Sequence, residues 1–326
     1  MSLDAQILTA LRGAGGGSVS GAELSQRLGV SRAAVWARID ELRSLGYEIE
    51  ASPHLGYRFL SAPDVLHADD LLSRLGETKV IGRDIRVFES TTSTNDVIEK
   101  LAHDGVKEGI VVFAELQTRG RGRLGRKWMS PGGKGLWFSV LLRPELAPQA
   151  ITQLTVASAT ALRRAIESQT GLKPEIKWPN DLLLSGKKVS GILTELSAEL
   201  DRVKYVILGI GVDVNLNAGD FPSELRNAAT SLKVELGRSL SRAELAVEIL
   251  RELDADYARV AGGSFPAVAD EWEAHCTTIG REVAIRTGDR QVRGRAESLG
   301  EDGALLLRTE HGHLERVVGG DVTLEK

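Results

Sequence analysis

The chain has 326 residues, of which 42% are hydrophobic and 26% charged, and its formal net charge at pH 7 is -4. This balance is typical of a globular protein with room for two or three domains, and the slight negative charge excludes wholesale electrostatic attraction to nucleic acid or membranes. No apolar run approaches the ~18 residues of a spanning helix, no signal-peptide pattern is present and Cys276 has no second cysteine to pair with, so we expect a cytoplasmic protein without membrane contact.

The first 62 residues have the pattern of a winged helix-turn-helix. Apolar residues at helical spacing predict a first helix near the N-terminus, and a run of glycines ends it. Ser20 caps a second short helix, which ends at Gly29, and Ser31 caps a third. The stretch 47–59 then predicts a small β-hairpin, the wing of such a domain.

The third helix predicts where this unit would touch DNA, since Ser31, Arg32 and Arg38 are its expected exposed polar positions. The charge of the unit does not distinguish a DNA-binding domain from a protein-interaction module. Residues 1–60 carry six arginines, no lysine and six carboxylates, whereas a nucleic-acid-binding module usually presents a basic face. Two interpretations follow: a DNA-binding domain whose affinity depends on dimerisation elsewhere, which the arrangement of helices and wing favours, and a protein-interaction module.

A hydroxyl-rich turn begins the central part of the chain, after a hinge at residues 62–64. A predicted strand over 85–89 leads into Ser90-Thr-Thr-Ser-Thr-Asn95, and a helix follows. Helix capping accounts for one of these hydroxyl groups. The remaining hydroxyls and the amide predict hydrogen bonds to a polar, uncharged group such as a urea or an amide.

A basic glycine-rich loop follows. Residues 119–134 include six basic side chains and no acidic one. Glycine lets backbone N–H groups approach phosphate oxygens, and arginine binds carboxylate or phosphate through two parallel hydrogen bonds. Predicted strands over 110–114 and 136–142 anchor the loop at both ends. The spacing fits neither a Walker A loop nor a Rossmann turn. We expect this loop to fold around an anion; the simpler alternative is a solvated charged loop.

Two further segments follow a long amphipathic helix predicted over 147–170. The stretch 176–195 predicts two strands joined by a tight turn, which places Asp181 and Lys188 on one side of the sheet. The apolar run 205–214 predicts a buried strand with two glycines two residues apart on one face. Their missing side chains leave room for a flat ligand or for close packing.

The C-terminal part changes to short strands separated by Gly-Asp and Glu-Asp-Gly turns, which predicts a small SH3-like β-barrel. His311 and His313 share a strand face, but two ligands without a third make a weak metal site, so we expect none formed by protein side chains. The predicted fold class is α+β. It comprises a winged helix-turn-helix over 1–62, a central mixed β-sheet with helices over 63–277 and the barrel over 278–326.

Several of these segments together resemble one family, the bifunctional biotin protein ligases that also repress the biotin operon. They occur in the family's order over nearly the whole chain, and the basic loop with Lys-Trp-Pro-Asn-Asp is the most specific match. The matching segments are Ser93-Thr-Asn95, Gln117, Gly120-Arg-Gly-Arg-Leu-Gly-Arg-Lys-Trp128, Lys177-Trp-Pro-Asn-Asp181, Lys188-Val-Ser-Gly-Ile-Leu193 and Gly209-Ile-Gly-Val-Asp-Val-Asn215.

The resemblance implies a class II synthetase-like central domain and two half-reactions. The carboxylate of biotin attacks the α-phosphate of Mg-ATP to give biotinyl-5′-AMP and pyrophosphate. A lysine amine of the biotin carboxyl carrier protein of acetyl-CoA carboxylase then takes the acyl group. Biotin, ATP and Mg²⁺ are the implied substrates and cofactors. Operator DNA and a second copy of the chain, in a ligand-promoted homodimer, are the other implied partners.

The resemblance also assigns residues to this reaction. Lys188 would meet the oxygen that bridges biotin and the α-phosphate, where a fixed cation stabilises developing charge, with Arg123 and Asp181 completing the catalytic set. The residues assigned to biotin are Ser93, Thr94, Asn95, Gln117, Arg121, Gly122, Arg123, Lys188 and Gly191. The residues assigned to the nucleotide are Arg121, Arg123, Arg126, Trp128, Lys177, Asn180, Lys188, Asp213 and Asn215.

Two positions depart from the family's pattern. Asp213 stands where the family commonly has asparagine, and a carboxylate accepts from the adenine amino group but cannot donate to a ring nitrogen. In addition, the stretch 228–232 has no aromatic residue to match the one that some bifunctional members place over the adenine.

Two other functions remain as alternatives. Lipoate-type protein ligases resemble biotin ligases in fold and also use a lysine near the acyl carbonyl, but an apolar acyl chain does not need the hydroxyl-rich turn at 90–95. A ligand-sensing transcription regulator without ligase activity is the second alternative, and the intact set of Arg121, Arg123 and Lys188 argues against it.

Overall fold

The computed structural model describes residues 1–199 and 202–324, and the chain divides into two compact units. One contains Met1–Glu77 and Ser241–Val247, and the other contains Thr78–Leu240 and Glu248–Lys326. The predicted domain limits at residues 62 and 277 stay predictions. None of the helices in the described ranges has both the length and the apolar character that crossing a membrane requires.

The first unit is the predicted winged helix-turn-helix with one more helix after it. Its caps form as expected: Ser20 Oγ accepts from Glu23 N at 3.0 Å, Ser31 Oγ accepts from Ala34 N at 3.1 Å, and Gly29 adopts the left-handed conformation that ends a helix. The elements are α1 (Leu3–Gly13), α2 (Gly21–Leu28), α3 (Arg32–Ser44), β1 (Glu48–Ser52), β2 (Gly56–Ser61) and α4 (Ala68–Leu75), and β1 pairs with β2 antiparallel.

The structure corrects the expectation that Arg38 is an exposed, available side chain of α3. Its guanidinium binds both carboxylate oxygens of Asp4 in α1, with Nε 2.6 Å from Oδ1, and also pairs with Glu41. Asp4 is buried, so Arg38 supplies the charge that this carboxylate needs inside the protein. Ser31 and Arg32 are exposed, as predicted.

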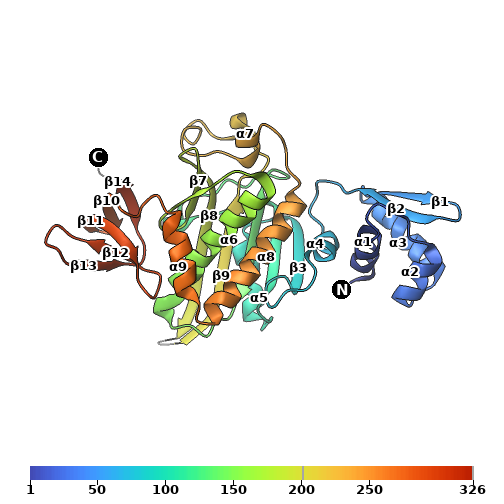
Figure 1. Ribbon diagram of the computed structural model, residues 1–326, viewed down its shortest axis with the longest axis horizontal. Coiled ribbons are helices and arrows are strands. Elements are labelled where there is room, and N and C mark those ends of the chain that lie inside the picture. The colour runs from blue at the N-terminus through green and yellow to red at the C-terminus, as the bar shows by residue number, and fades with distance from the viewer. Residues whose placement is uncertain (200–201, 325–326) are drawn as a thin grey trace. The chain divides into compact units, whose positions relative to one another are not determined.

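The second unit is built on a seven-stranded mixed sheet (Figure 1), which confirms the predicted central fold. Among the strand pairs that the structure describes in this sheet, β3 and β4 are parallel and the other neighbours are antiparallel. The strand order is β3 (Asp84–Thr91), β4 (Ile110–Gln117), β5 (Leu136–Leu142), β9 (Arg202–Val212), β8 (Lys187–Glu199), β7 (Asp181–Leu184) and β6 (Glu175–Lys177).

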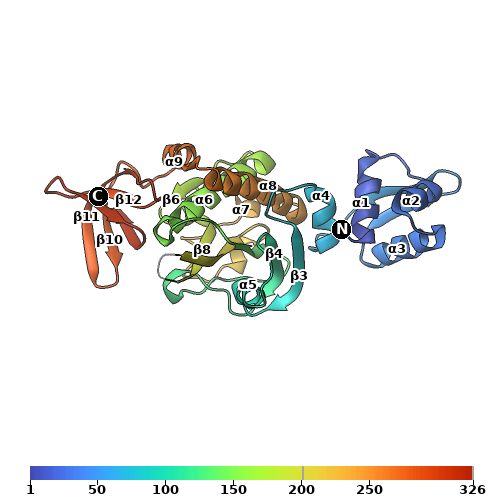
Figure 2. The ribbon, with the colours of Figure 1, turned by 90° about the horizontal axis from the view of Figure 1, so that it is seen from below.

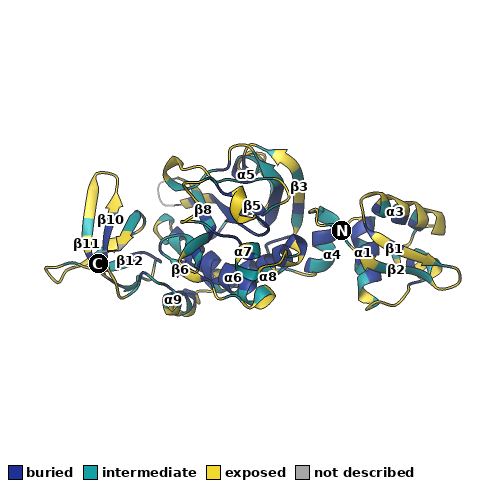
Figure 3. Ribbon diagram, turned by 90° about the horizontal axis from the view of Figure 1, so that it is seen from above, coloured by how far each residue is buried: buried dark blue, intermediate teal, exposed yellow. Residues whose placement is uncertain are grey.

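Helices cover both faces of this sheet. Figure 2 shows α6 and α8 on one face and α5 on the other, and α6 is mostly buried (Figure 3). The helical elements of this part are α5 (Thr94–His103), α6 (Thr152–Thr170), α7 (Leu232–Leu236), α8 (Arg242–Ala261) and α9 (Phe265–Ala274), with single 3₁₀ turns at Arg123–Gly125, Pro148–Ile151 and Ala218–Asp220. The first residues of α8, up to Val247, belong to the first unit.

The C-terminal residues form a five-stranded antiparallel sheet. Its order is β13 (Leu314–Val317), β12 (Leu305–Arg308), β11 (Arg290–Leu299), β10 (Glu282–Thr287) and β14 (Asp321–Leu324). The antiparallel strands confirm the predicted all-β C-terminal part, while its closure into an SH3-like barrel stays a prediction. Strand β14 was not predicted from the sequence.

Candidate functional site

A cleft of about 430 Å³ lies in the second unit and brings together segments far apart in the sequence. Every residue that the resemblance assigns to biotin lines it, and so does every nucleotide residue except Asn215. The cleft is lined by Ser93, Thr94, Asn95, Gln117, Arg121, Gly122, Arg123, Arg126, Lys127, Trp128, Lys177, Asn180, Asp181, Lys188, Gly191 and Asp213, together with apolar residues and Gly320, Asp321 and Val322.

The floor of the cleft exists because β9 has glycines on the face that α5 covers. Side chains alternate along a strand, so Gly209 and Gly211 lie on the same face as Tyr205 and Ile207, which pack against α5. A Cβ at Gly209 would lie 2.3 Å from Asn95 Oδ1, and one at Gly211 would lie 2.5 Å from Trp128 Nε1. These glycines therefore allow the side chains of Asn95 and Trp128 to approach the backbone of β9 closely.

Hydrogen-bonded amides and hydroxyls form one end of the cleft, here called the polar end: Thr94, Asn95 and Gln117 line the cleft, and the fully buried Ser139 contacts two of them. Thr94 donates to Gln117 Oε1 through both N (2.8 Å) and Oγ1 (3.1 Å). The Ser139 hydroxyl lies 2.7 Å from Thr94 Oγ1 and also contacts Asn95 Oδ1. Part of the hydroxyl surplus predicted for a ligand therefore bonds within the protein. Ser93 precedes α5 but makes no side-chain cap bond.

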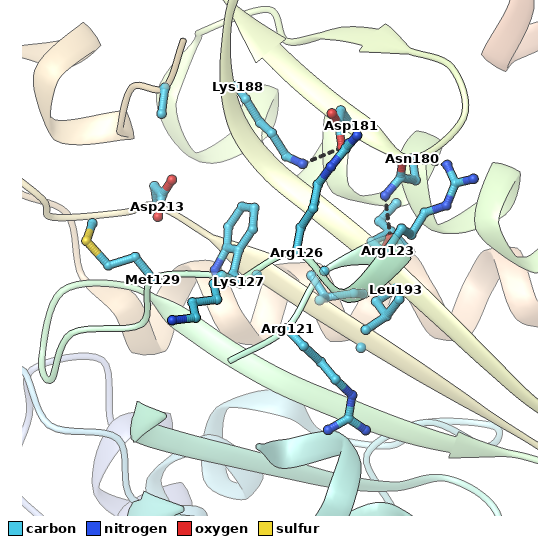
Figure 4. Close-up of a pocket in the computed structure, with 18 of the residues that line it drawn as sticks. Arg121, Arg123, Arg126, Lys127, Met129, Asn180, Asp181, Lys188, Leu193 and Asp213 are labelled. Carbon is cyan, nitrogen blue, oxygen red and sulfur yellow. Dashed lines mark hydrogen bonds and ion pairs between the residues drawn. The ribbon is translucent and has the colours of Figure 1, made fainter. Parts of the chain in front are cut away.

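Arg121 forms ion pairs with two carboxylates. Its Nε lies 3.0 Å from Glu195 Oε1, and Nη1 pairs with Asp96. Hydrogen bonding to Glu195, more than to Asp96, raises the pKa of Arg121 above its ordinary value. Figure 4 shows its guanidinium directed away from Lys188. In this structure Arg121 organises the polar end.

Sequence reasoning missed Glu195, although a signal existed. Gly191, Leu193 and Glu195 alternate along β8, and they pair with Gly211, Gly209 and Ile207 of β9. The spacing of two therefore places Glu195 on the face of the sheet that holds the cleft, where its Oε2 accepts from Asn95 Nδ2 at 2.7 Å.

Four polar side chains form the opposite end, here called the cationic end (Arg123, Asn180, Asp181 and Lys188; Figure 4). Lys188 Nζ lies 2.6 Å from Asp181 Oδ1 and 5.1 Å from the centre of the Trp128 ring. Arg123 Nη1 donates to Asn180 Oδ1 at 3.2 Å. Burial lowers the pKa of Arg123, with Asp181 and Asp321 opposing the shift. This end therefore presents two cations, of which Lys188 is paired with Asp181 and Arg123 is bonded to the neutral amide of Asn180.

Backbone contacts hold Lys188 in place from two sides. Its N donates to Ala228 O and its O accepts from Thr230 N, both at 2.8 Å. The segment 228–230 is thus hydrogen-bonded to the strand that carries Lys188. This segment has no aromatic side chain, as noted from the sequence, and Ala228 and Ala229 line the cleft with Trp128 and Phe221.

Asp213 follows β9 and contributes a buried carboxyl group to the cleft. Its side chain is only 4% exposed. Burial raises its pKa well above the ordinary value of 3.8, and the nearby cation of Lys188 only opposes this shift. A carboxyl group that is protonated can both donate and accept hydrogen bonds, which a carboxylate cannot do.

We expect the substitution Asp213→Asn to remove a pH dependence of stability. The folded pKa is raised, so the stabilisation from Asp213 is complete below 3.8 and decreases as the pH rises through the folded value. The wild-type free energy of unfolding should fall relative to the variant by up to about 1.4 kcal/mol per pH unit in that window. Urea unfolding of both proteins from pH 4 upward measures this, and parallel pH profiles would contradict a raised pKa of Asp213.

Asn215 is a correction to the predicted nucleotide set. Its side-chain amide donates to Leu240 O at 2.9 Å and accepts from Leu240 N at 3.0 Å, and its backbone N donates to Lys134 O at 2.6 Å. Its side chain therefore holds a loop instead of lining the cleft. Asp321, by contrast, was not predicted: it lines the cleft and pairs with Arg126, although no local sequence signal connects β14 with the basic loop.

The described residues contain no group of three or more histidine, cysteine, aspartate or glutamate side chains placed to hold a metal ion. Cys276 is buried, and this burial raises its pKa. It does not line the cleft.

Models of three families match the chain. The Biotin/lipoate A/B protein ligase family matches residues 87–213, the HTH domain matches 4–58 and the Biotin protein ligase C terminal domain matches 278–324. The first match includes the polar end and the cationic end of the cleft. The second covers the helix-turn-helix.

Individual proteins are similar over most of the chain. Bifunctional ligase/repressor BirA of Bacillus subtilis is 39% identical over 95% of each chain, and that of Escherichia coli is 30% identical over 94% of this chain and 92% of the other. A biotin protein ligase from Aquifex aeolicus, solved in complex with biotin and ATP, superimposes with a TM-score of 0.64 at 31% identity, covering 75% of this chain and 99% of that one.

Proposed function

Because the chain belongs to the family of bifunctional biotin protein ligases and repressors, we propose that its cleft joins biotin to ATP and then to a lysine of a carrier protein. The protein is a biotin protein ligase with a helix-turn-helix repressor domain. Its carrier is the biotin carboxyl carrier protein. The observation that supports this function best is a cleft with hydrogen-bonding amides at one end and fixed cations at the other.

The polar end suits the ureido ring of biotin. A urea has two N–H donors and a strong acceptor oxygen, and it needs matching partners when buried. Thr94, Asn95 and Gln117 supply hydroxyl and amide groups whose orientations are fixed by bonds to one another and to Ser139. A lipoyl ring has neither N–H donors nor a carbonyl oxygen that could match these groups.

The cationic end suits the reacting carboxylate and the α-phosphate. An oxygen of biotin's carboxylate attacks the α-phosphorus, the bond to the bridging oxygen of the β-phosphate breaks, and pyrophosphate leaves. Lys188 and Arg123 both line the cationic end and would stabilise the negative charge that develops in this step. The carrier's lysine amine then attacks the acyl carbon and AMP leaves. We assign Asp181, whose Oδ1 lies 2.6 Å from Lys188 Nζ, to positioning the carrier's lysine, whose amine loses a proton as the amide forms.

Magnesium enters this scheme with ATP. Mg²⁺ prefers oxygen ligands and is usually bound through one or two carboxylates together with substrate phosphates. Asp181 and Asn180 place such oxygens in the cationic end. Their position fits a cation carried by the nucleotide.

Pyrophosphate exchange tests the ligase assignment directly. The chain should exchange labelled pyrophosphate into ATP with biotin, and not with lipoate or octanoate at the same concentration. The reverse preference would replace this function with a lipoate-type ligase. Absence of exchange with all three acids would instead favour a sensor that only binds its effector.

We expect Arg123→Gly to release biotinyl-AMP into solution. The Arg123 side chain bridges the basic loop to Asn180 and is partly buried, so its loss removes a contact that closes the loop over the intermediate. A single turnover with labelled biotin should yield several-fold more free biotinyl-AMP than wild type, while biotin affinity should fall by a smaller factor. Arg119→Gly is the matched control, because Arg119 is exposed and lies outside the cleft. Equal retention in both variants would contradict the closing role.

The repressor function requires operator DNA, and we propose that a ligand-promoted homodimer binds it. The charge of residues 1–60 is balanced, so one copy has little electrostatic attraction for phosphate. Two copies on a two-fold symmetric site would double the contacts. Binding of biotinyl-AMP to the dimer in preference to the monomer would then couple repression to biotin supply.

Sedimentation and gel-shift titrations with and without biotin plus ATP test this coupling. We expect both dimerisation and binding to an inverted-repeat DNA to increase with the ligands. Equal DNA affinity in the two states would contradict the coupling, and no binding in either would leave the first unit as an interaction module.

A further inference from the structure

The exposed face of α3 carries a large aromatic side chain to which the proposed function assigns no role. Trp36 is 57% exposed. The core of the first unit takes Val35, Ile39 and Leu42 from the other side of the helix, and all three are buried. Trp36 is therefore not a core residue that projects slightly into solvent.

The neighbours of Trp36 on this face are small or cationic. An α-helix has about 3.6 residues per turn, so Arg32 lies one turn before Trp36, and Ala33 lies one turn before Ala37. All four side chains are exposed (Figure 3 shows the exposure of α3). Within the part of the chain that the structure describes, no hydrogen bond or ion pair engages the Arg32 guanidinium.

Charged side chains are distributed unevenly along α3. Arg32 lies at the N-terminal end, and the carboxylates Asp40 and Glu41 lie in the second half, where Glu41 pairs with Arg38. In helix-turn-helix proteins the N-terminal residues of the motif's second helix, which is α3 in this chain, contact base edges. The half of α3 that would enter the groove therefore offers one guanidinium, one indole and two methyl groups.

We propose that Trp36 contacts thymine methyl groups in the major groove, so that α3 reads A·T pairs in the operator through apolar contact. This inference rests on the proposed operator binding. Thymine alone presents a methyl group in that groove, and apolar side chains recognise it. Ala33 and Ala37 let the helix backbone approach the bases closely. Arg38, the residue expected from the sequence to reach DNA, is held by Asp4 instead.

The composition of the face favours DNA over a protein partner. Trp36 is the only large apolar side chain exposed within α3, all of which the structure describes. Protein interfaces have an apolar core of several side chains, whereas contact with a thymine methyl needs one.

The test uses the full chain with biotin and ATP. Wild-type protein first enriches binding sites from a random duplex pool, and deoxyuridine then replaces each conserved thymine in turn, which removes only the methyl group. Wild type should lose about fourfold in affinity at each contacted thymine, because burial of one methyl group contributes about 0.8 kcal/mol. Trp36→Ala should bind the unmodified site more weakly and lose nothing further on those replacements.

Two further measurements separate this contact from other effects. Trp36→Ala should keep the wild-type dependence of affinity on salt, whereas Arg32→Ala should reduce that slope by about one if it contacts a phosphate. Circular dichroism and pyrophosphate exchange equal to wild type would show that the variant remains folded and active.

The outcomes are distinguishable. Failure of the wild-type chain to enrich any sequence would overturn operator binding and this inference with it. Enrichment followed by equal deoxyuridine penalties in both proteins would overturn the thymine contact alone. Loss of dimerisation in Trp36→Ala, with unchanged penalties, would assign the side chain to a protein interface.

Discussion

Lys188→Ala should reduce the rate of adenylate formation by about 10²–10³-fold, because removing one fixed group that stabilises developing charge costs about 2.7–4 kcal/mol in the transition state. The Lys188 side chain is 31% exposed and pairs with Asp181, so its truncation leaves no sealed cavity and no fully buried charge. Pyrophosphate exchange measures the loss, and the unfolding temperature should change little.

Lys187→Ala is the matched control for this variant. Lys187 is the adjacent lysine of β8, but it does not line the cleft, and its Nζ lies 3.5 Å from Arg226 O. Its truncation should leave exchange at the wild-type rate. Wild-type exchange in Lys188→Ala, or an equal loss in both variants, would remove Lys188 from the reaction.

Gly209→Ala should weaken biotin binding by about 10- to 100-fold. The new Cβ would lie 2.3 Å from Asn95 Oδ1 and 3.0 Å from Asn95 Cγ, so Asn95 must move. That movement breaks its bonds to Ser139 and Glu195 and leaves buried polar groups unpaired, at a cost of about 1–3 kcal/mol. Isothermal titration with biotin measures the effect.

The control for this variant is Gly219→Ala. Gly219 has open space around its Cβ position and does not require a positive φ, so an added methyl group meets nothing. Biotin affinity equal to wild type is expected there. If Gly209→Ala also binds biotin normally, then the polar end of the cleft does not hold biotin.

Local patterns determined most of the secondary structure. Ser20, Ser31 and Gly29 delimit helices through bonds within a few residues, so the sequence alone predicts the helix-turn-helix. Alternation along a strand likewise predicts that Gly209 and Gly211 share a face. The turn that the sequence predicts at 185–186 is confirmed by the pairing of β7 with β8.

Contacts between distant segments could be predicted only in part from the sequence. The sequence alone predicts that Asp181 and Lys188 lie on one side of a hairpin, and they form an ion pair. It does not predict that Asn95 meets Glu195, because the order of strands in the sheet decides which side chains of β8 face α5.

The sequence by itself therefore determined the helix-turn-helix and the common face of Gly209 and Gly211 on β9. Each of these depends on residue type and on interactions within one element. Only the tertiary structure decided that Arg38 neutralises Asp4, that Asn215 supports a loop and that Asp321 reaches the cleft. These roles depend on which partner comes within hydrogen-bonding distance, and the packing of separate elements sets that distance.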